Sequence, residues 1–372
     1  MTSRHVCLKH LAARDFRNFE KLDLDFPEAG LAIVGENGQG KTNLLESIYY
    51  LQVLRSVRGA RDQDLVRFGA KGFHLSASSS SEYAHELSVG FVTHGRKKRV
   101  TRDGSVSPRL SDAFGSLPSV LFSPRDVQLI AGAPSERRRF LDLVLALSSR
   151  RYLTALQFYR AALSRRNAAL REAARTGDDA TVSVWEPALA EHGAVLVRSR
   201  DEWVRGRAAE FSRIASAIGE TGASRMAYSS AAAREPDAAV ALEEALGRQR
   251  KHDIRRGMTH SGPHRDDLSL TLEGRDLRLF GSAGQQRTAA ITLRLLESAT
   301  LRESRGTSPV MLLDDPFAEL DSNRSARILG LLAERGMGQT ILVVPKPGDI
   351  PSQLVNLERR RIVSGVVYQG AA

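Results

Sequence analysis

An eight-residue glycine-rich segment near the start of the chain has the clearest chemical meaning. It fits the pattern G-x-x-x-x-G-K-[ST], in which the glycines let backbone N–H groups surround phosphate oxygens, the lysine neutralises phosphate charge and the hydroxyl binds Mg²⁺. The apolar run Leu31 to Val34 precedes the segment, and a helical apolar pattern follows it as far as Val53. The segment consists of Gly35, Glu36, Asn37, Gly38, Gln39, Gly40, Lys41 and Thr42. It predicts a P-loop (Walker A motif) that takes ATP and Mg²⁺ as cofactors.

Two adjacent aspartates follow a second apolar run near the other end of the chain. Val310 to Leu313 are apolar, and Asp314 and Asp315 come directly after them. Because parallel sheets bind ligands at the carboxyl ends of their strands, this run has the form of a Walker B strand. We expect Asp314 to hold Mg²⁺ together with Thr42, and Asp315 to act with Lys41 in catalysis by orienting or deprotonating a water molecule. The alternative is a simple turn at the end of a strand.

A serine and a glycine open a predicted helix from about residue 283 to residue 303. Ser282, Gly284 and Gln285 allow close approach of the backbone to a phosphate, although an ordinary serine-capped helix has the same residues. The Walker B strand comes next, and Glu319-Leu320-Asp321 follows it. This order predicts a signature loop at Ser282 and a D-loop at Asp321.

The two nucleotide motifs lie much farther apart in the sequence than one ordinary domain requires. Long amphipathic helices rich in Ala, Leu and Arg fill the interval between them. The sequence therefore predicts an α/β fold in three parts. These are the first half of an ATPase lobe at residues 1–130, a helical insertion at 131–255, and the second half of the lobe at 256–372.

Alternating apolar residues predict further strands in both halves of the lobe. Turn pairs at residues 94–95 and 103–104 indicate antiparallel hairpins between Glu86 and Ser107, which would form a side sheet. Two more strands are expected at Leu268 to Leu272 and at Leu277 to Phe280, and an end strand near Ile362 to Tyr368. The serine-rich segment Ser76 to Ser81 is expected to be an exposed loop or edge.

Composition favours a polyanionic partner and a reducing compartment. The chain has 54 Lys and Arg against 43 Asp and Glu, a net charge of +11, and its one cysteine, Cys7, allows no intrachain disulfide. No stretch is apolar enough to cross a membrane, so we expect a cytoplasmic protein with no membrane partner. Nucleic acid is the first candidate, although many proteins are simply basic. Residues 137–213 hold fifteen arginines against nine acidic residues, yet arginines on such helices also pair with acids or cover apolar surface.

The motifs resemble an ABC-type P-loop ATPase head of the SMC class, and the closer resemblance is to the RecF family of bacterial recombination-mediator proteins. The resemblance runs nearly from end to end of the chain. Its blocks are Phe16 to Phe19, Gly35 to Leu51, Phe122 to Pro124, Arg137 to Asp142 and Gly262 to Leu268.

The resemblance implies an ATP-dependent homodimer in which the Ser282 loop of each chain contacts the γ-phosphate held by the other. It also implies DNA binding to single-stranded, double-stranded and gapped substrates. RecR and RecO would be partners in placing RecA on DNA during repair, recombination and replication. Arg17 and Asn18 would lie near the base and ribose of the nucleotide, although a purely structural turn explains them equally well.

Two departures from the wider ABC pattern concern hydrolysis. Asp315 replaces the glutamate that many ABC ATPases have after the Walker B aspartate, and its shorter side chain suits a weak ATPase that works as a switch. After the strand Thr340 to Val344, relatives have a switch loop with Thr or His. This chain has Pro345 to Asp349 instead, and Lys346 is the candidate substitute for the residue that senses the γ-phosphate.

Three other classes share parts of this pattern. An SMC-like structural DNA clamp needs hundreds of heptad residues between its motifs, which the insertion lacks. A transporter ATPase would have a fuller signature and a region that couples to a membrane partner. A P-loop kinase would keep its motifs in one continuous domain.

Overall fold

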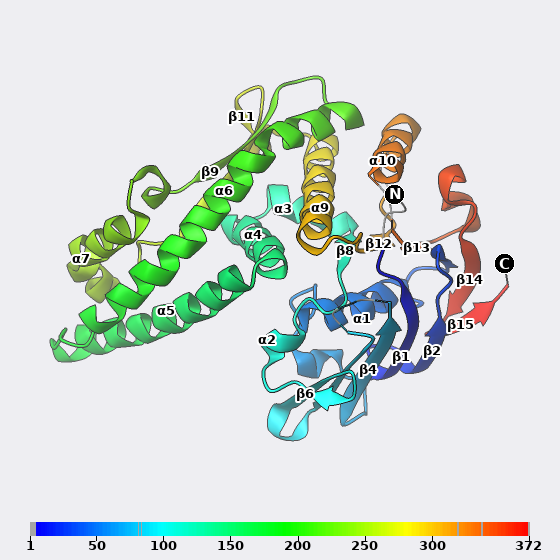
Figure 1. Ribbon diagram of the computed structural model, residues 1–372, viewed down its shortest axis with the longest axis horizontal. Coiled ribbons are helices and arrows are strands. Elements are labelled where there is room, and N and C mark those ends of the chain that lie inside the picture. The colour runs from blue at the N-terminus through cyan, green and yellow to red at the C-terminus, as the bar shows by residue number, and fades with distance from the viewer. Residues whose placement is uncertain (1–4, 81, 83, 318–319, 336–337, 371–372) are drawn as a thin grey trace. The chain divides into compact units, whose positions relative to one another are not determined.

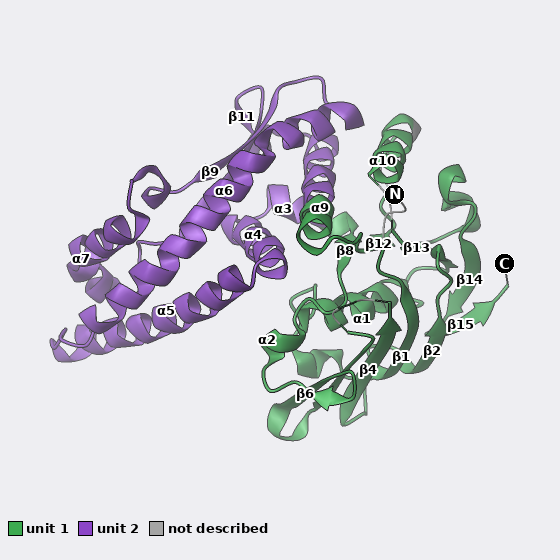
Figure 2. Cartoon of the chain, viewed as in Figure 1, with its two compact units in different colours: residues 1–125, 297–372 green, residues 126–296 purple. Residues whose placement is uncertain are grey.

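The computed structural model describes residues 5–80, 82, 84–317, 320–335 and 338–370. The chain divides into two compact units (Figure 2). Unit 1 comprises residues 1–125 and 297–372, and unit 2 comprises residues 126–296. Both ends of the chain therefore belong to unit 1, which holds the two six-stranded sheets, whereas helices α5 (Arg150–Thr176), α6 (Glu186–Ile218) and α7 (Ala238–Arg256) belong to unit 2 (Figure 1).

The main sheet of unit 1 joins strands from both ends of the chain. Its strands are β3 (Gly30–Val34), β8 (Ser119–Phe122), β12 (Val310–Asp314), β13 (Thr340–Val344), β14 (Glu358–Val363) and β15 (Val366–Gln369). They lie in the order β15-β14-β3-β13-β12-β8, and only the edge strand β15 runs antiparallel to its neighbour. Every residue of β3, β12 and β13 is buried, as parallel strands covered on both faces require. This burial explains the continuous apolar runs in the sequence.

The second sheet of unit 1 is antiparallel. Its strands are β1 (Leu8–Phe16), β2 (Phe19–Asp25), β4 (Gly72–Ser79), β5 (Glu86–Val92), β6 (Lys97–Arg102) and β7 (Ser105–Val106), in the order β2-β1-β4-β5-β6-β7. The predicted hairpins are confirmed, with Gly95 (φ +71°) and Gly104 (φ +77°) at their turns. Helix α1 (Lys41–Val53) contacts strands of both sheets, and this contact accounts for the burial of eleven of its thirteen residues.

Unit 2 consists mainly of long helices with a small sheet. Its helices are α3 (Gln128–Ala131), α4 (Pro134–Ser148), α5 (Arg150–Thr176), α6 (Glu186–Ile218), α7 (Ala238–Arg256) and α8 (Leu277–Phe280). Its sheet has the order β11-β10-β9 and contains β9 (Ser224–Ser229), β10 (Asp267–Leu272) and β11 (Arg275–Asp276). Helix α9 (Ala283–Arg305) begins in unit 2 and ends in unit 1, which also contains α2 (Leu110–Ala113) and α10 (Ser322–Glu334).

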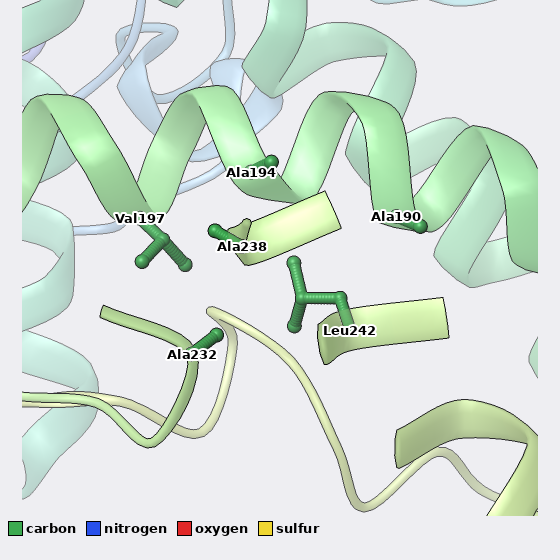
Figure 3. Packing of buried hydrophobic residues seen from close by; sticks show 6 residues of the cluster. All are labelled: Ala190, Ala194, Val197, Ala232, Ala238 and Leu242. Carbon is green, nitrogen blue, oxygen red and sulfur yellow. The ribbon is translucent and has the colours of Figure 1, made fainter. Parts of the chain in front are cut away.

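Small side chains let α6 and α7 pack closely. Ala190, Ala194 and Val197 of α6 point toward Ala238 and Leu242 of α7, and Ala232 closes the cluster (Figure 3). A Cβ at Gly193 would lie 3.0 Å from Leu242 Cδ1, so this position has little room for a larger residue. The alanine-rich pattern of the insertion is thus a helix-packing surface.

The limits of unit 2, residues 126 and 296, differ from the predicted limits of the insertion, residues 131 and 255. Residues 256–296 cluster with the helical segment in unit 2. The physical reason is the pairing of β10 with β9 along its whole length, from Asp267↔Ser229 to Leu272↔Ser224. A strand of the predicted C-terminal half therefore belongs to the same small sheet as a strand of the insertion.

Three local predictions were wrong. Leu277–Phe280 forms the short helix α8 because the Asp276 side chain accepts a hydrogen bond from Arg278 N and caps it. Ser76–Ser79 lie in the interior strand β4, where small side chains alternate with the buried Leu75 and Ala77. The expected end strand is two strands, β14 and β15, separated by a turn at Ser364 (φ +49°) and Gly365 (φ +83°).

A fully buried arginine joins three helical segments of unit 2. Arg166 of α5 is 0% exposed and donates to Asp253 Oδ2 of α7 at 2.8 Å and to Glu186 Oε1 of α6 at 3.0 Å. It also donates to Thr259 Oγ1 at 2.9 Å. Because a buried charge is stable only with partners, this cluster depends on all of its members.

Arg166→Met should lower the free energy of unfolding of unit 2 by about 3 kcal/mol, because it leaves two buried carboxylates without their shared cation. Arg165→Met is the matched control. Arg165 is exposed and its guanidinium lies 5.0 Å from the Trp185 ring, so its loss should cost about 1 kcal/mol or less. Urea unfolding can be followed by tryptophan fluorescence, since both tryptophans, Trp185 and Trp203, lie in unit 2. Equal midpoints for the two variants would contradict this account.

Candidate functional site

The predicted P-loop connects the carboxyl end of β3 to the start of α1 in unit 1. Gly38 (φ +83°) and Gly40 (φ +114°) have left-handed backbone angles, which strongly favour glycine. A Cβ at Gly40 would lie 2.7 Å from Asn18 Nδ2, and one at Gly35 would lie 2.5 Å from the Ile362 carbonyl oxygen. Close neighbours therefore require glycine at positions 35 and 40, whereas at position 38 only the backbone angle favours it.

Lys41 is held inside the loop rather than in solvent. Its side chain is largely buried, and its Nζ donates to the Gly35 carbonyl oxygen and, at 2.8 Å, to the Glu36 carbonyl oxygen. Burial lowers the pKa of Lys41, while the nearby carboxylates of Asp314, Asp315 and Glu36 act in the opposite direction. The ammonium group is thus positioned beside the loop that would surround phosphate oxygens.

The two predicted Mg²⁺ ligands lie side by side. Thr42 Oγ1 donates to Asp314 Oδ1 at 3.2 Å, although the residues come from opposite ends of the chain. Burial raises the pKa of Asp314, and the hydrogen bond from Thr42 and the charge of Arg58 oppose this effect. A hydroxyl and a carboxylate are oxygen ligands of the kind that Mg²⁺ prefers, so these two residues fit the ion.

Asp315 sits in an unusual backbone conformation at the end of β12. Its φ is +44°, in the left-handed region, and its N–H donates to the Val343 carbonyl oxygen at 3.0 Å. Non-glycine residues rarely adopt such angles except where the surrounding structure holds them. The parallel pairing of β12 with β13 therefore fixes the backbone of the candidate catalytic aspartate.

The β1–β2 turn contains the two predicted base and ribose contacts. Asn18 Nδ2 donates to the Gln39 carbonyl oxygen at 3.1 Å, and Asn18 Oδ1 accepts from Asn43 Nδ2 at 2.8 Å. Arg17 donates from Nε and NH2 to both carboxylate oxygens of Glu46, at 3.0 and 3.1 Å. Asn18 thus adjoins the P-loop backbone, whereas Arg17 is bound to a buried acid of α1.

Sequence motifs did not single out Glu46 and Arg58. Glu46 is 1% exposed and also accepts from Ser56 Oγ at 2.5 Å, and Arg58 Nε lies 3.6 Å from it. Arg58 NH2 donates to Asn43 Oδ1 at 3.2 Å. The only signal in the sequence is an acidic residue on the otherwise apolar face of α1.

The turn between β14 and β15 forms hydrogen bonds with the P-loop residue Gln39. The Ser364 N–H donates to Gln39 Oε1 at 2.6 Å, and the Gly365 N–H donates to the Gln39 carbonyl oxygen at 2.9 Å. A Cβ at Gly365 would lie 2.9 Å from the Asn18 carbonyl oxygen. Two turns, one from each end of the chain, therefore pack against the same P-loop residue.

The predicted signature residues belong to unit 2. Ser282 and Gln285 form a reciprocal capping box at the start of α9, with Ser282 N–H to Gln285 Oε1 at 2.8 Å and Gln285 N–H to Ser282 Oγ at 3.3 Å. Gly284 lies in the same first turn, and Ser282 is exposed. The motif therefore caps a helix and also presents its serine to solvent.

The remaining predicted residues lie in unit 1 after the Walker B strand. Asp321 caps α10 by accepting from Arg324 N at 2.9 Å, whereas Glu319 lies outside the described residues. The exposed Lys346 follows β13 and donates its N–H to Asp349 Oδ2 at 3.0 Å. The structure thus gives Asp321 a capping role and leaves the Lys346 side chain exposed.

Asp314→Asn should raise the thermal midpoint of the nucleotide-free protein at pH 7. Because the folded-state pKa of Asp314 is raised, the unfolded chain ionises this group first, and the resulting cost is fully present only above the raised pKa. The gain should shrink as the pH falls toward the ordinary range of aspartate. Asp25→Asn, at an exposed position, is the control, and a lowered midpoint for Asp314→Asn at pH 7 would refute the argument.

Comparisons with known proteins agree on one family. Residues 7–350 match the RecF/RecN/SMC N terminal domain. The chain is 38% identical to the DNA replication and repair protein RecF of Symbiobacterium thermophilum, with 86% of each chain covered. It is 34% identical to the protein of the same name from Roseiflexus castenholzii, with 96% of this chain and 98% of the relative covered.

Solved structures give the same result. The chain matches the recombination mediator protein RecF of the RecFOR pathway, bound to ATPrS, with a TM-score of 0.90 and 29% identity over the full length of both chains. It also matches the Smc head domain from Pyrococcus furiosus with a TM-score of 0.55 and 17% identity, a likeness of fold. No helix in the described part of the chain has the length and apolar character needed to span a membrane. The chain belongs to the RecF family of DNA replication and repair proteins, which are ABC-type ATPases with the α/β head fold, antiparallel side sheet and helical part that the sequence predicted.

Proposed function

We propose that this chain binds ATP and Mg²⁺ at the P-loop and uses slow hydrolysis as a switch that controls its hold on DNA during recombinational repair and replication. The observation that carries the proposal is the contact of Thr42 with Asp314 beside the buried Lys41, because it joins a phosphate loop to a carboxylate at one edge of a parallel sheet. The match to RecF bound to ATPrS supports it.

In this proposal the P-loop residues Gly35 to Thr42 hold the phosphates, with Lys41 turning from its carbonyl acceptors to the β- and γ-phosphate oxygens. Mg²⁺, held by Thr42 and Asp314, would neutralise phosphate charge. Asp315 orients a water molecule and accepts its proton as the oxygen attacks the γ-phosphorus and the bond to the bridging oxygen breaks, which yields ADP and phosphate. Asn18, next to Gln39, and Arg17 are the proposed contacts to the base and ribose.

The dimer follows from the number of motifs per chain. ABC chemistry needs a signature loop opposite each Walker A motif, and this chain has one of each. We infer that two chains meet with ATP between them, with Ser282, Gly284 and Gln285 of each contacting the γ-phosphate held by the other and with Asp321 as the D-loop residue. The exposure of Ser282 at the start of α9 supports this role.

Gapped DNA with single- and double-stranded parts is the proposed substrate, and RecR and RecO are the proposed partners in placing RecA. A purely structural SMC-like clamp is disfavoured, since α6, with 33 residues, is the longest helix of the described chain and no long coiled-coil arm exists there. The higher TM-score to RecF, 0.90 against 0.55, points the same way.

The dimer can be tested by light scattering after size exclusion. Addition of ATP and Mg²⁺ should double the molar mass, and Ser282→Arg should stay monomeric because it blocks the contact in trans while its own P-loop still binds nucleotide. A wild-type protein that remains monomeric with ATP at every concentration would remove this mechanism for the isolated chain.

Variants of Asp315 separate catalysis from binding. Asp315→Asn should lower kcat for ATP hydrolysis by about 10²-fold or more, with little change in the affinity for ATP, because a general base contributes roughly 10²–10⁴-fold. Asp315→Glu should raise kcat, since its longer side chain reaches the water better. A steady-state phosphate-release assay measures both, and unchanged turnover in Asp315→Asn would exclude the assigned role.

A further inference from the structure

The antiparallel sheet of unit 1 has one face that its core does not use. Side chains alternate between the faces of a strand, and Leu11, Leu75 and Val89 are fully buried on one side. The residues between them, such as His74, point to the other side, which is exposed or half-buried. We call this second side the open face. Figure 1 shows β6, β4, β1 and β2 of this sheet in that order.

Basic residues line up across the strands of the open face. The register pairs Lys21 with Arg14, Arg14 with His74, His74 with Gly90, and Gly90 with Arg99. These five residues form one line across five neighbouring strands, which we call the basic row. At about 4.8 Å between strands, the row is about 19 Å long. Lys21, Arg14, His74 and Arg99 are all exposed.

Most residues next to the basic row have short side chains, and further positive charge lies at its β6 end. On one side lie the exposed Asp23 and four small or short side chains, namely Ala12, Ser76, Ser88 and Thr101. On the other side Val92 pairs with the exposed Lys97, and Arg96 is exposed in the preceding turn. A partner can therefore reach the positive charges of the row without steric hindrance from long neighbouring side chains.

The cations of the basic row and Lys97 form no ion pairs within the described part of the chain. Lys21, Arg14, Lys97 and Arg99 form no ion pair with any described residue, whereas Lys98, next in sequence but on the opposite face, is bound to Asp62 at 2.7 Å. Acidic residues of the open face lie in other rows. Asp23 lies in the row next to the basic row, where it is bound to His10 at 2.9 Å. Asp25 and Glu86 lie two register rows from the basic row.

We propose that the basic row binds the sugar–phosphate backbone of DNA. The inference rests on the proposed function and adds to it the surface that holds the DNA. Burial and the charge of Arg14 lower the pKa of His74, so the cations of the row are Lys21 and Arg14 on neighbouring strands and Arg99 three strands from Arg14. Exposed cations spread along a smooth surface suit a polyanion, whose binding depends on neutralised phosphates and released counterions. An acidic protein partner is the weaker candidate, because protein interfaces depend on aromatic and large apolar anchors. Among the described residues of these rows, the large apolar side chains are two valines, Val92 and Val106.

One end of the basic row lies close to the predicted P-loop. Arg14 and Lys21 flank the β1–β2 turn, in which Asn18 donates to the Gln39 carbonyl oxygen of the P-loop. A phosphate backbone bound at Arg14 and Lys21 would therefore lie one turn away from the loop that is proposed to hold ATP.

The test is a comparison of Arg14→Ala/Arg99→Ala with Arg102→Ala/Arg109→Ala in the full chain. Both double variants lose two positive charges, but Arg102 lies on the other face of β6, where it donates to the Asp112 carbonyl oxygen, and Arg109 precedes α2. Fluorescence anisotropy with a labelled gapped duplex, ATP and Mg²⁺ gives the affinity between about 50 and about 300 mM salt. Binding of a fluorescent ATP analogue checks that each variant keeps its nucleotide site.

Loss of two phosphate contacts should reduce the slope of log affinity against log salt by about 1.8 and weaken binding roughly 10- to 100-fold at 0.1 M salt. The control pair should keep the wild-type slope, and all variants should bind the nucleotide alike. A wild-type slope for Arg14→Ala/Arg99→Ala overturns the basic row, including the case in which the row binds an acidic protein. If the wild-type chain binds no DNA with ATP, the proposed function fails and the basic row fails with it.

Discussion

The parallel pairing of β3, β13 and β12 is the interaction on which the proposed nucleotide site depends. These strands come from both ends of the chain, and their register, with Ala32 opposite Leu342 and Leu313 also opposite Leu342, brings their carboxyl ends to one edge of the sheet. Thr42 and Asp314 meet there, 3.2 Å apart. The cost of closing a long connection grows only slowly with its length, so the whole of unit 2 can lie between the two motifs without weakening this pairing.

Burial disfavours the charged forms of two residues at the proposed nucleotide site, Lys41 and Asp314. It lowers the pKa of Lys41 and raises the pKa of Asp314, so the charged form of each is disfavoured while they also attract one another. In the proposed function, a phosphate and a divalent cation would supply the counter-charges that both groups need. The β1–β2 turn and the C-terminal hairpin pack on Gln39 from outside, so the loop backbone is already in place before those charges arrive.

The excess of positive charge divides into two kinds of arginine. In unit 2, Arg137 is bidentate with Asp267 at 2.8 Å, Arg166 binds two buried acids, and Arg200 joins Asp142 to the Pro263 carbonyl oxygen. These contacts bring together the sequence blocks 137–142 and 262–268, so their chemistry is internal. These three arginines of the insertion are thus used internally, while most of its other arginines are exposed, as are Arg14 and Arg99 of the antiparallel sheet.

The sequence by itself determined the P-loop, the Walker B strand, the long helices and the family, because each depends on residue types at short, regular spacing. It did not reveal that Glu46 holds Arg17, that the Ser364 turn supports Gln39, or that residues 256–296 cluster with the helices. Nor did it show which arginines are buried and which form one row across a sheet. Those features depend on strand register and on contacts between distant segments, and only the folded chain decides them, because burial and pairing are properties of neighbours in space.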